Sequence, residues 1–338
     1  MKYQIAVKPN FNIAFFDKYL EMCQVEIRTV LAGHGIIMND VKIVNVNKAK
    51  MLTFEVDQPI EIKALKAIWQ LSFFFMLFQV EDNGILKSIS IDHQPDFEDD
   101  LSVRLKYNGK TNETITRMMM NLALASSDFA HEEHPKMLDP LCGRGTTLFE
   151  GMISGYDVYG VDKDQKSVAE LGTYITRYVK EARLKHTNKR GKLIHLGKHT
   201  GDLFELQYAK EKSDYKSGLL RELKVVRGDT TNFDGAFRQK YMHLIVADFP
   251  YNVQHSAKSG DGNGLSWLLD AGLKSWTPFL KKGGAIAISW NIYTDKRASL
   301  IQIFEEHGYE VMNDYGLNEL EHRVSQAITR DIIIARKK

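Results

Sequence analysis

The spacing of apolar residues changes once along the chain, near residues 103–110. Before this point, short apolar runs rich in Val, Ile and Phe predict β-strands, and two stretches with helical spacing predict helices. The predicted strands cover residues 3–9, 41–47, 51–56, 73–80 and 85–91, and the predicted helices cover residues 15–32 and 61–69. We therefore expect a small α+β domain over residues 1–105.

From residue 106 to residue 338, predicted helices and strands alternate. The predicted strands cover residues 136–141, 157–162, 223–228, 243–248, 284–290, 309–315 and 327–335. The predicted helices cover residues 113–127, 147–154, 168–182, 265–280 and 296–307, and a polar insertion follows the third of them. Such alternation predicts a mostly parallel sheet covered on both faces. The last two strands lack a helix between them, so the closing pair should be antiparallel.

Composition is that of an ordinary globular protein. With 338 residues, 43% of them apolar and 26% charged, the chain can bury a substantial core. No apolar run approaches the ~20 residues of a membrane span, and the first residues do not resemble a secretory signal. Two cysteines, Cys23 and Cys142, are too few for a disulfide framework. We expect a cytoplasmic protein without a membrane contact.

Positive charge gathers in one segment, which runs from Arg177 to His199 and contains a single acid, Glu181. The net charge of +2 is too small to indicate a nucleic-acid partner by itself. The segment fits a solvated helix face followed by a loop, and it fits equally well a surface that binds phosphates. Both interpretations remain open.

A glycine-rich turn follows the strand predicted at residues 136–141. Gly143 and Gly145 leave backbone amides open to a ligand, and Thr147 with Glu150 predicts a capping box at the start of the next helix. A dinucleotide-binding fingerprint would need a third glycine at position 148, which is leucine here. The turn therefore favours a ligand other than NAD.

Acidic residues lie at or near the ends of four predicted strands. Asp162 ends the strand after the turn, where it can accept from both hydroxyls of a ribose, although it could also cap the following helix. Asp229, next to Thr230, can accept from an adenine amino group, although Gly228-Asp229 is also an ordinary turn dipeptide. Since ligands bind at the carboxyl ends of such strands, we expect these acids on one rim: Asp139, Asp162, Asp229 and Asp248.

The motifs DPLCGRGTT, from Asp139 to Thr147, and DFPY, from Asp248 to Tyr251, resemble those of class I S-adenosylmethionine-dependent methyltransferases that act on exocyclic amino groups of bases. The chain is most similar to the THUMP-associated guanosine N2-methyltransferases of tRNA. The resemblance implies a Rossmann-like α/β fold with a seven-stranded sheet, and a helix at residues 111–123 that closes over the cofactor. It implies S-adenosylmethionine contacts at Asp139, Pro140, Cys142, Gly143, Gly145, Thr146, Thr147, Asp162, Lys163, Asp229, Thr230 and Asp248. It assigns catalysis to Asp248, Phe249, Pro250 and Tyr251.

In this family the second position of DFPY is usually proline. The resemblance implies that Asp248 and the main-chain carbonyl of residue 249 accept from the amino group, whose lone pair then faces the methyl donor. Phe249 retains that carbonyl but is less rigid than proline. Tyr251 would stack on the base. The expected partner is RNA, with tRNA first, and the resemblance implies that the domain over residues 1–105 presents the RNA as a reduced THUMP-like module.

Two other functions remain open. One is an N6-adenine methyltransferase of DNA or ribosomal RNA, and the other is a non-catalytic cofactor- or RNA-binding relative, which Phe249 motivates. The eleven histidines show no metal-binding spacing, so we expect no metal. The sequence does not indicate an oligomeric state.

Overall fold

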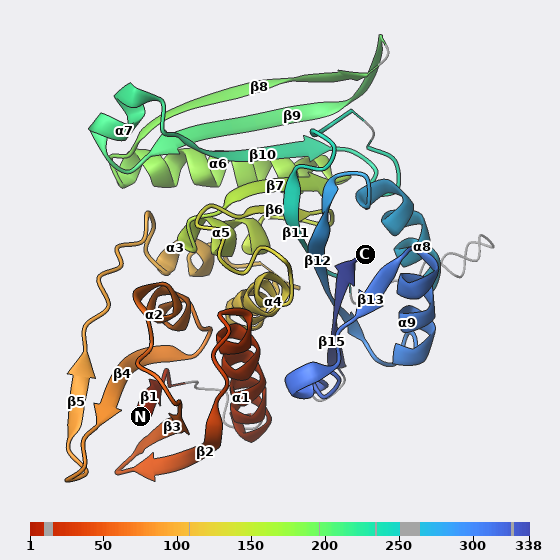
Figure 1. Ribbon diagram of the computed structural model, residues 1–338. Helices are drawn as coiled ribbons and strands as arrows, with labels where there is room; N and C mark the ends of the chain where they lie inside the picture. The colour runs from red at the N-terminus through yellow and green to blue at the C-terminus, as the bar shows by residue number, and fades with distance from the viewer. Residues whose placement is uncertain (10–15, 108, 196, 234, 251–263, 326–327) are drawn as a thin grey trace.

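The computed structural model contains two β-sheets with helices between and around them (Figure 1). It describes residues 1–9, 16–107, 109–195, 197–233, 235–250, 264–325 and 328–338. No helix in these ranges is long and apolar enough to cross a lipid bilayer.

The first sheet has five antiparallel strands in the order β2-β3-β1-β4-β5. Its strands are β1 (Lys2–Val7), β2 (Asn39–Val46), β3 (Ala49–Glu55), β4 (Phe74–Val80) and β5 (Leu86–Ile89). The helices of this part are α1 (Phe16–Gly33), α2 (Ile62–Trp69) and the short α3 (Asp100–Val103). All five predicted strands and both predicted helices are present, whereas α3 was not predicted.

The second sheet is large and mixed, in the order β13-β15-β12-β11-β6-β7-β10-β9-β8, and β14 pairs with β15. Seven of its strands match the predicted ones: β6 (Lys136–Asp139), β7 (Asp157–Asp162), β10 (Arg221–Arg227), β11 (Met242–Asp248), β12 (Leu280–Asn291), β13 (Tyr309–Val311) and β15 (Ile328–Lys337). From β10 to β12 the neighbouring strands are parallel, while β15 is antiparallel to both β12 and β13. The predicted Rossmann-like α/β architecture with an antiparallel closing pair is confirmed.

The polar insertion is folded, which the sequence pattern did not indicate. It forms the long antiparallel hairpin β8 (Lys185–His195) and β9 (Lys198–Ala209), followed by α7 (Lys212–Ser217). Phe204, Leu206 and Tyr208 alternate with more exposed residues along β9 and are buried, as expected for a strand with one face on a core. Because β9 pairs with β10, the hairpin extends the sheet to its outer edge (Figure 1). Residues 185–195 are therefore strand and not loop. The remaining strand, β14 (His322–Ser325), was also not predicted.

Helices cover both faces of the large sheet. One face packs against α4 (Glu113–Ala125), α5 (Thr146–Ile153) and α6 (Gln165–Glu181), and the other packs against α8 (Leu265–Trp276) and α9 (Arg297–Glu306). Neighbouring residues of β11 alternate between these faces, since Leu244 joins the first cluster and Ile245 the second. The carboxyl ends of β6, β7 and β11 are thereby held at one rim.

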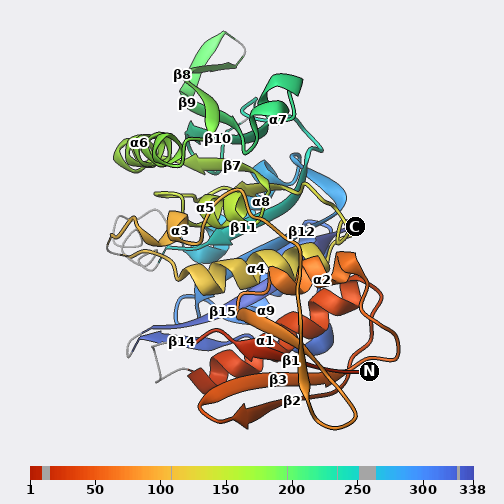
Figure 2. The same cartoon turned by 90° about the vertical axis from the view of Figure 1, so that its left-hand side faces the viewer.

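Helix α4 lies between the two sheets (Figure 2). Met118, Met119 and Met120 occupy successive positions and are all buried, because α1 contacts one side of the helix and the large sheet contacts the other. Buried apolar residues of the first sheet and of α4 belong to one cluster. The division of the chain at residues 105 and 106 remains a prediction.

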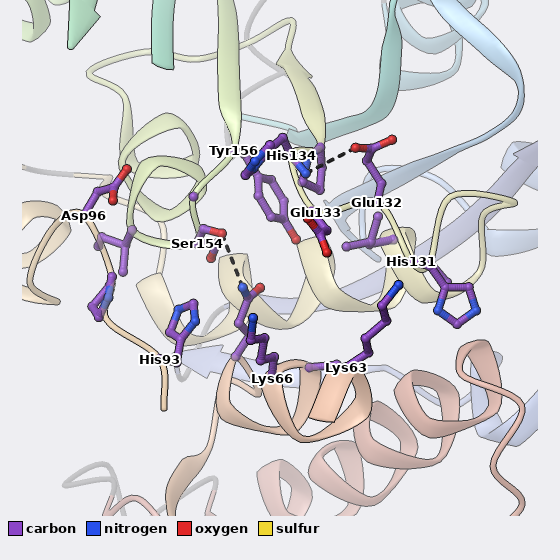
Figure 3. Close-up of a pocket in the computed structure, with 18 of the residues that line it drawn as sticks. Lys63, Lys66, His93, Asp96, His131, Glu132, Glu133, His134, Ser154 and Tyr156 are labelled. Carbon is purple, nitrogen blue, oxygen red and sulfur yellow. Dashed lines mark hydrogen bonds between the residues drawn. The ribbon is translucent and has the colours of Figure 1, made fainter. Parts of the chain in front are cut away.

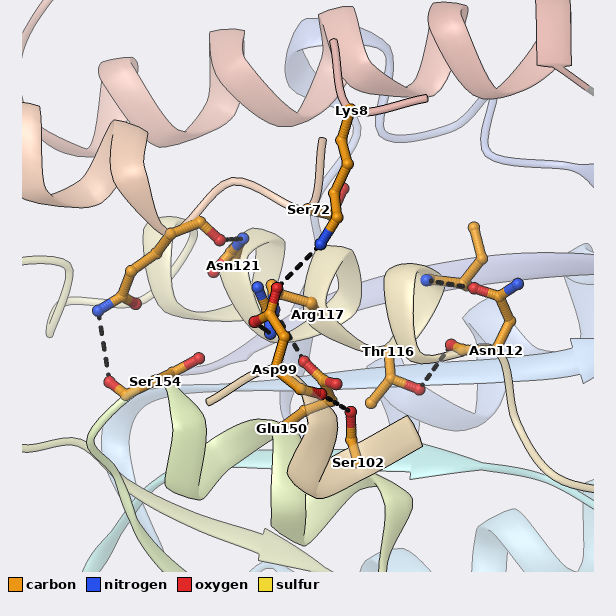
Figure 4. A network of polar contacts seen from close by, with 12 residues as sticks. Lys8, Ser72, Asp99, Ser102, Asn112, Thr116, Arg117, Asn121, Glu150 and Ser154 are labelled. Atoms are coloured by element: carbon orange, nitrogen blue, oxygen red, sulfur yellow. Dashed lines mark hydrogen bonds and ion pairs between the residues drawn. The ribbon is translucent and has the colours of Figure 1, made fainter. Parts of the chain in front are cut away.

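Charged and polar side chains also join the two parts of the chain (Figure 4). Arg117 on α4 forms ion pairs of 2.8 Å with Asp99 and with Glu150 on α5, and Asp99 pairs with Lys8 at 2.8 Å.

The capping box predicted from Thr147 and Glu150 is wrong. Gly145 is the N-cap of α5 and makes no side-chain cap, while Glu150 points to Arg117.

Candidate functional site

A cleft of about 800 Å³ lies at the carboxyl ends of β6, β7 and β11. The predicted site residues that line it are Asp139, Pro140, Cys142, Gly143, Thr146, Thr147, Asp162, Lys163, Asp229, Thr230, Asp248, Phe249 and Pro250. Gly145 does not line the cleft, and Tyr251 lies outside the described residues. The tertiary structure thus brings the four expected aspartates to one cavity, which we call the carboxyl-end cleft.

Both glycines of the turn have positive φ angles, which residues with a side chain adopt only at an energetic cost. Gly143 and Gly145 have φ angles of 51° and 94°. A Cβ added at Gly145 would lie 2.7 Å from a methyl carbon of Leu171, so glycine is also required for packing against α6. A Cβ at Gly143 would meet nothing within 4 Å and would project into open space beside the cleft. The turn exposes main chain where a ligand can approach.

Asp162 holds the glycine turn in place. Its Oδ2 accepts from the Gly143 amide at 2.8 Å, and its Oδ1 accepts from the Asp164 amide at 2.8 Å. The N-cap of α6 is Asp164, whose side chain accepts from the Ser167 amide. The alternative that Asp162 caps this helix is therefore wrong. The lone pairs left on the Asp162 carboxylate remain available to a ligand in the cleft.

Asp139 lies at the base of the cleft, where it is 2% exposed. Burial raises the pKa of its carboxyl to about 7, although the Leu141 amide and the Thr147 hydroxyl donate to it and oppose the rise. Near neutral pH this group is therefore divided between its neutral and ionised forms.

Asp229 stands at the exposed side of the cleft, just beyond the end of β10. Its Oδ1 accepts from both the amide and the hydroxyl of Thr231 at 2.8 Å. The indole of Trp276 donates to the Thr230 carbonyl at 2.9 Å. The strand therefore stops before Asp229, and the acid sits in a side-chain-stabilised turn.

Asp248, the last residue of β11, binds two side chains from distant parts of the chain. Its Oδ2 accepts from the Thr111 hydroxyl at 2.7 Å, and its Oδ1 forms an ion pair with the Nη2 group of Arg330. The same Nη2 donates to the Phe249 carbonyl at 2.9 Å. Both acceptors that the motif assigns to a base amine therefore already bind Arg330, a residue that the sequence motifs did not identify.

Further residues of the cleft were also missed. Tyr107 shares a hydrogen bond of 2.8 Å with Thr146, and the guanidinium of Arg144 lies 4.9 Å from the centre of the Tyr107 ring. Trp267 and Leu268 line the opposite part. The helix expected at residues 111–123 begins at Glu113 as α4 and does not line the cleft, whereas Tyr107, Gly109 and Thr111 before it do.

Cys142 is buried in the turn after β6, and its sulfur lies close to Gly160 on β7. Burial raises the pKa of its thiol well above the usual value, so the reactive thiolate does not form near neutral pH. A Cβ at Gly160 would lie 2.8 Å from the Cys142 sulfur, which shows how closely the turn after β6 approaches β7 here.

A second cavity, of about 290 Å³, lies between α2 and the segment before β6 (Figure 3). Histidines line it together with lysines and acids, including His93, His131, His134, Lys63 and Lys66. Across the described ranges, no group of three or more His, Cys, Asp or Glu side chains is arranged to hold a metal ion.

The basic segment contributes to both sides of a groove between α6 and β8. Thr173, Thr176, Arg177, Lys180, Glu181, Asn188 and Arg190 line this groove, which we call the α6–β8 groove. Arg177 pairs with Glu181 at 2.7 Å, and the Arg190 guanidinium lies 5.4 Å from the centre of the Phe204 ring. Three cations against one acid give the groove a positive charge.

The carboxyl-end cleft fits the expected S-adenosylmethionine. Its volume lies within the range of about 300–1,000 Å³ typical of small-molecule sites. It offers exposed main chain at Gly143, a carboxylate at Asp162 for ribose hydroxyls, and a carboxylate at Asp229 for an amino group. These are the donors and acceptors that an adenosine-containing cofactor requires.

A family model described as UPF0020: RMKL-like, methyltransferase domain matches residues 104–310, which is more than half of the chain. Similar solved structures include TrmN from Thermus thermophilus, with 14% identity, a TM-score of 0.37, and coverage of 88% of this chain and 59% of that one. This chain thus spans less than two thirds of TrmN. A TehB-like SAM-dependent methyltransferase from Corynebacterium glutamicum has 14% identity and a TM-score of 0.36, covering 61% of this chain and 82% of that one. An rRNA methylase from Streptococcus thermophilus has 9% identity and a TM-score of 0.35, covering 65% and 95%. No curated protein matches the sequence.

Proposed function

The chain belongs to the RMKL-like methyltransferase domain family, and from this we propose that it methylates an exocyclic amino group of an RNA base. The acceptor we put first is guanosine N2 in tRNA. The cofactor of this domain is S-adenosylmethionine, which supplies an electrophilic methyl group when it is bound.

The cleft residues have distinct parts in this proposal. Asp162 accepts from the ribose hydroxyls while its bond to the Gly143 amide keeps the turn open. Asp229 accepts from the adenine amino group at the outer end of the cleft. Leu268 and Trp267 contribute apolar surface that excludes water from the reacting end.

Asp248 and the Phe249 carbonyl act on the acceptor base. An amino group on a base is a weak nucleophile, because its lone pair is delocalised into the ring. Two acceptors that bind its hydrogens draw the nitrogen toward tetrahedral geometry and direct the lone pair at the methyl donor. The observation that carries the proposal is that these two oxygens already converge on one nitrogen, the Nη2 of Arg330. They are therefore spaced to serve one amino group.

The α6–β8 groove supports RNA as the substrate. Arg177, Lys180 and Arg190 present positive charge, and Thr173, Thr176 and Asn188 add hydrogen-bonding groups that suit phosphate oxygens. Helix α6 begins at the cleft, since Ser167 in its first turn lines the cavity. A strand bound along α6 would thus lead toward the cleft.

The function is tested by methyl transfer from labelled S-adenosylmethionine to total tRNA, ribosomal RNA and DNA in separate reactions. We expect label in tRNA, and mass spectrometry of the nucleosides should identify N2-methylguanosine. Label in DNA or ribosomal RNA as N6-methyladenosine would support the adenine methyltransferase instead. Label in none would contradict an enzymatic role.

Replacing the acceptor carboxylate should slow the reaction. Asp248→Ala should lower kcat at least ~100-fold, about 3 kcal/mol of transition-state stabilisation, while the Kd of S-adenosylmethionine changes less. The same change leaves Arg330 buried without its carboxylate, which costs ~3–5 kcal/mol of folding stability. Asp248→Asn keeps an acceptor oxygen and should lose less activity, so thermal unfolding and single-turnover rates of both variants are needed. Near-normal turnover of Asp248→Ala would remove this residue from the mechanism.

A further inference from the structure

Arg330 is a buried charged residue on β15, next to Asp331 and just before the apolar run of residues 332–334. It is 3% exposed. A buried guanidinium is tolerated only where several acceptors replace its hydration. Arg330 has several such acceptors, so hydrogen bonds compensate for the burial of its charge.

Among the described residues, its hydrogen bonds reach Asp248 and Phe249 at the cleft and Ser289 on the neighbouring strand β12. Nη2 binds the Asp248 carboxylate, the Phe249 carbonyl at 2.9 Å and the Ser289 carbonyl at 2.8 Å, while Nε donates to the Ser289 hydroxyl at 2.7 Å. Ser289 is the residue of β12 paired with Asp248 in the sheet. One side chain thus ties the ends of three neighbouring strands to one another.

Arg330 borders a different cavity from the carboxyl-end cleft. Arg330 is absent from the residues that line that cleft, whereas Asp248 and Phe249 are among them. Arg330 lines a smaller cavity of about 280 Å³, which Asp248 also borders. A carboxylate or carbonyl oxygen has two lone pairs, so each acceptor can bind Arg330 on one side and a second amino group on the cleft side.

The network also makes up for the missing proline at position 249. Phe249 has an amide hydrogen that proline lacks, and this amide donates to the Ser289 carbonyl at 2.9 Å. Arg330 donates to both the Phe249 and the Ser289 carbonyls. The Phe249 ring is 1% exposed and packs on Trp276. The peptide after Asp248 is therefore fixed by hydrogen bonds and packing instead of by a ring.

We propose that Arg330 is a positioning residue that aligns the Asp248 carboxylate and the Phe249 carbonyl for the acceptor amine. This inference rests on the proposed function. In this proposal, Arg330 on β15 fixes the peptide after Asp248, which the family motif usually fixes with proline. The DFPY sequence is then compatible with catalysis.

The test compares Arg330→Gln and Arg330→Lys with the wild type in the full-length protein. We expect Arg330→Gln to lower kcat about 10- to 100-fold, since a misplacement of about 1 Å can cost that much. The KM for RNA and the Kd of S-adenosylmethionine should change less than about threefold, because neither ligand is bound by Arg330. Lysine has no forked group that reaches two acceptors, so the kcat of Arg330→Lys should fall between those of the wild type and Arg330→Gln.

Arg297→Gln is the matched control. Arg297 also binds residues of β15, namely Asp331 at 2.7 Å and the Ile332 carbonyl at 3.0 Å. Among the described residues, its hydrogen-bond partners do not include Asp248 or Phe249. It should lose thermal stability without a comparable loss of kcat. Guanidinium ion at non-denaturing concentration should partly restore kcat of Arg330→Ala, with sodium chloride at equal ionic strength as the reference.

The following results would contradict the inference. Unchanged kcat in Arg330→Gln, with kcat lost in Asp248→Ala, would make Arg330 only structural. A raised kcat or lowered KM for RNA would show that Arg330 competes with the base for the acceptors. A wild type that methylates no nucleic acid would instead be the failure of the proposed function, and the inference would fall with it.

Discussion

Both carboxylate oxygens of Asp162 accept from the main chain, one from the Gly143 amide and one from the Asp164 amide. The sequence motif predicts a ribose-binding acid here, and the structure adds that the same acid fixes the glycine turn. Asp248 likewise combines two roles, because it is an expected acceptor and the counter-charge of Arg330. At the residue scale, the side chains with predicted ligand roles are also the ones that shape the cleft.

Asp162→Ala should weaken S-adenosylmethionine binding by about 10- to 100-fold. Hydrogen bonds to charged groups contribute about 1.5–3 kcal/mol, and the turn at Gly143 loses its acceptor as well. Isothermal titration calorimetry measures the change. Asp164→Asn is the control, because asparagine caps a helix as well as aspartate and leaves Asp162 in place. An unchanged Kd in Asp162→Ala would place the ribose elsewhere.

Helix α6 and strand β8 together form the positively charged α6–β8 groove. Arg177 and Lys180 lie on the helix and Arg190 on the strand, and the groove exists because the hairpin turns back beside the helix. The Arg190 guanidinium also reaches Thr173 on α6. The predicted charge cluster is therefore a built surface at the edge of the sheet.

The double variant Lys180→Gln with Arg190→Gln should weaken RNA binding and make it less sensitive to salt. Each phosphate that the variant no longer neutralises should lower the slope of log K against log salt by about 0.7–0.9. Binding isotherms at several salt concentrations give this slope. Lys212→Gln with Lys216→Gln on α7 removes the same charge from exposed positions outside the groove and should leave the slope nearly unchanged. Equal slopes for both double variants would separate the groove from RNA binding.

The two sheets are joined by buried polar groups as well as by apolar packing. Glu26 on α1 is fully buried and accepts from the Ser72 amide, the Ser72 hydroxyl and the Asn121 side chain on α4. Burial raises the pKa of its carboxyl from 4.5 to about 7, against the lowering effect of these hydrogen bonds. The junction between the two parts of the chain therefore carries a group that titrates near neutral pH.

The free energy of unfolding should depend on pH through Glu26. Between pH 4.5 and about 7 the folded state binds a proton that the unfolded state has released, so stability falls as pH rises. A shift of this size corresponds to about 3 kcal/mol. Glu26→Gln imitates the protonated acid, and its stability advantage over the wild type should grow across this range and level off above it.

Urea denaturation at a series of pH values measures this difference. Glu21→Gln on the same helix is the control, because Glu21 is exposed and pairs only with Lys18 among the described ion pairs. A Glu26→Gln curve parallel to that of the wild type at all pH values would show that Glu26 does not titrate in this range.

Patterns within short stretches of the sequence were sufficient for most of the fold. Strand alternation, helix spacing and the glycine turn depend on neighbouring residues, so the seven strands of the predicted sheet and its antiparallel closing pair could be read from the chain. The hairpin β8–β9 was missed because its charges outweighed the alternation of Phe204, Leu206 and Tyr208. Its stability comes from pairing with β10.

The sequence by itself determined which acids stand at the strand ends, since a parallel sheet places all carboxyl ends on one rim. Only the tertiary structure decided what those acids bind. Thr111 and Arg330 are separated from Asp248 by 137 and 82 positions, and no local pattern connects them. An arginine just before the apolar run of β15 was visible in the sequence, but its partners depend on the strand order β15-β12-β11. Contacts across neighbouring strands arise from folding in three dimensions, and for that reason the arginine beside the acceptor pair was found only in the structure.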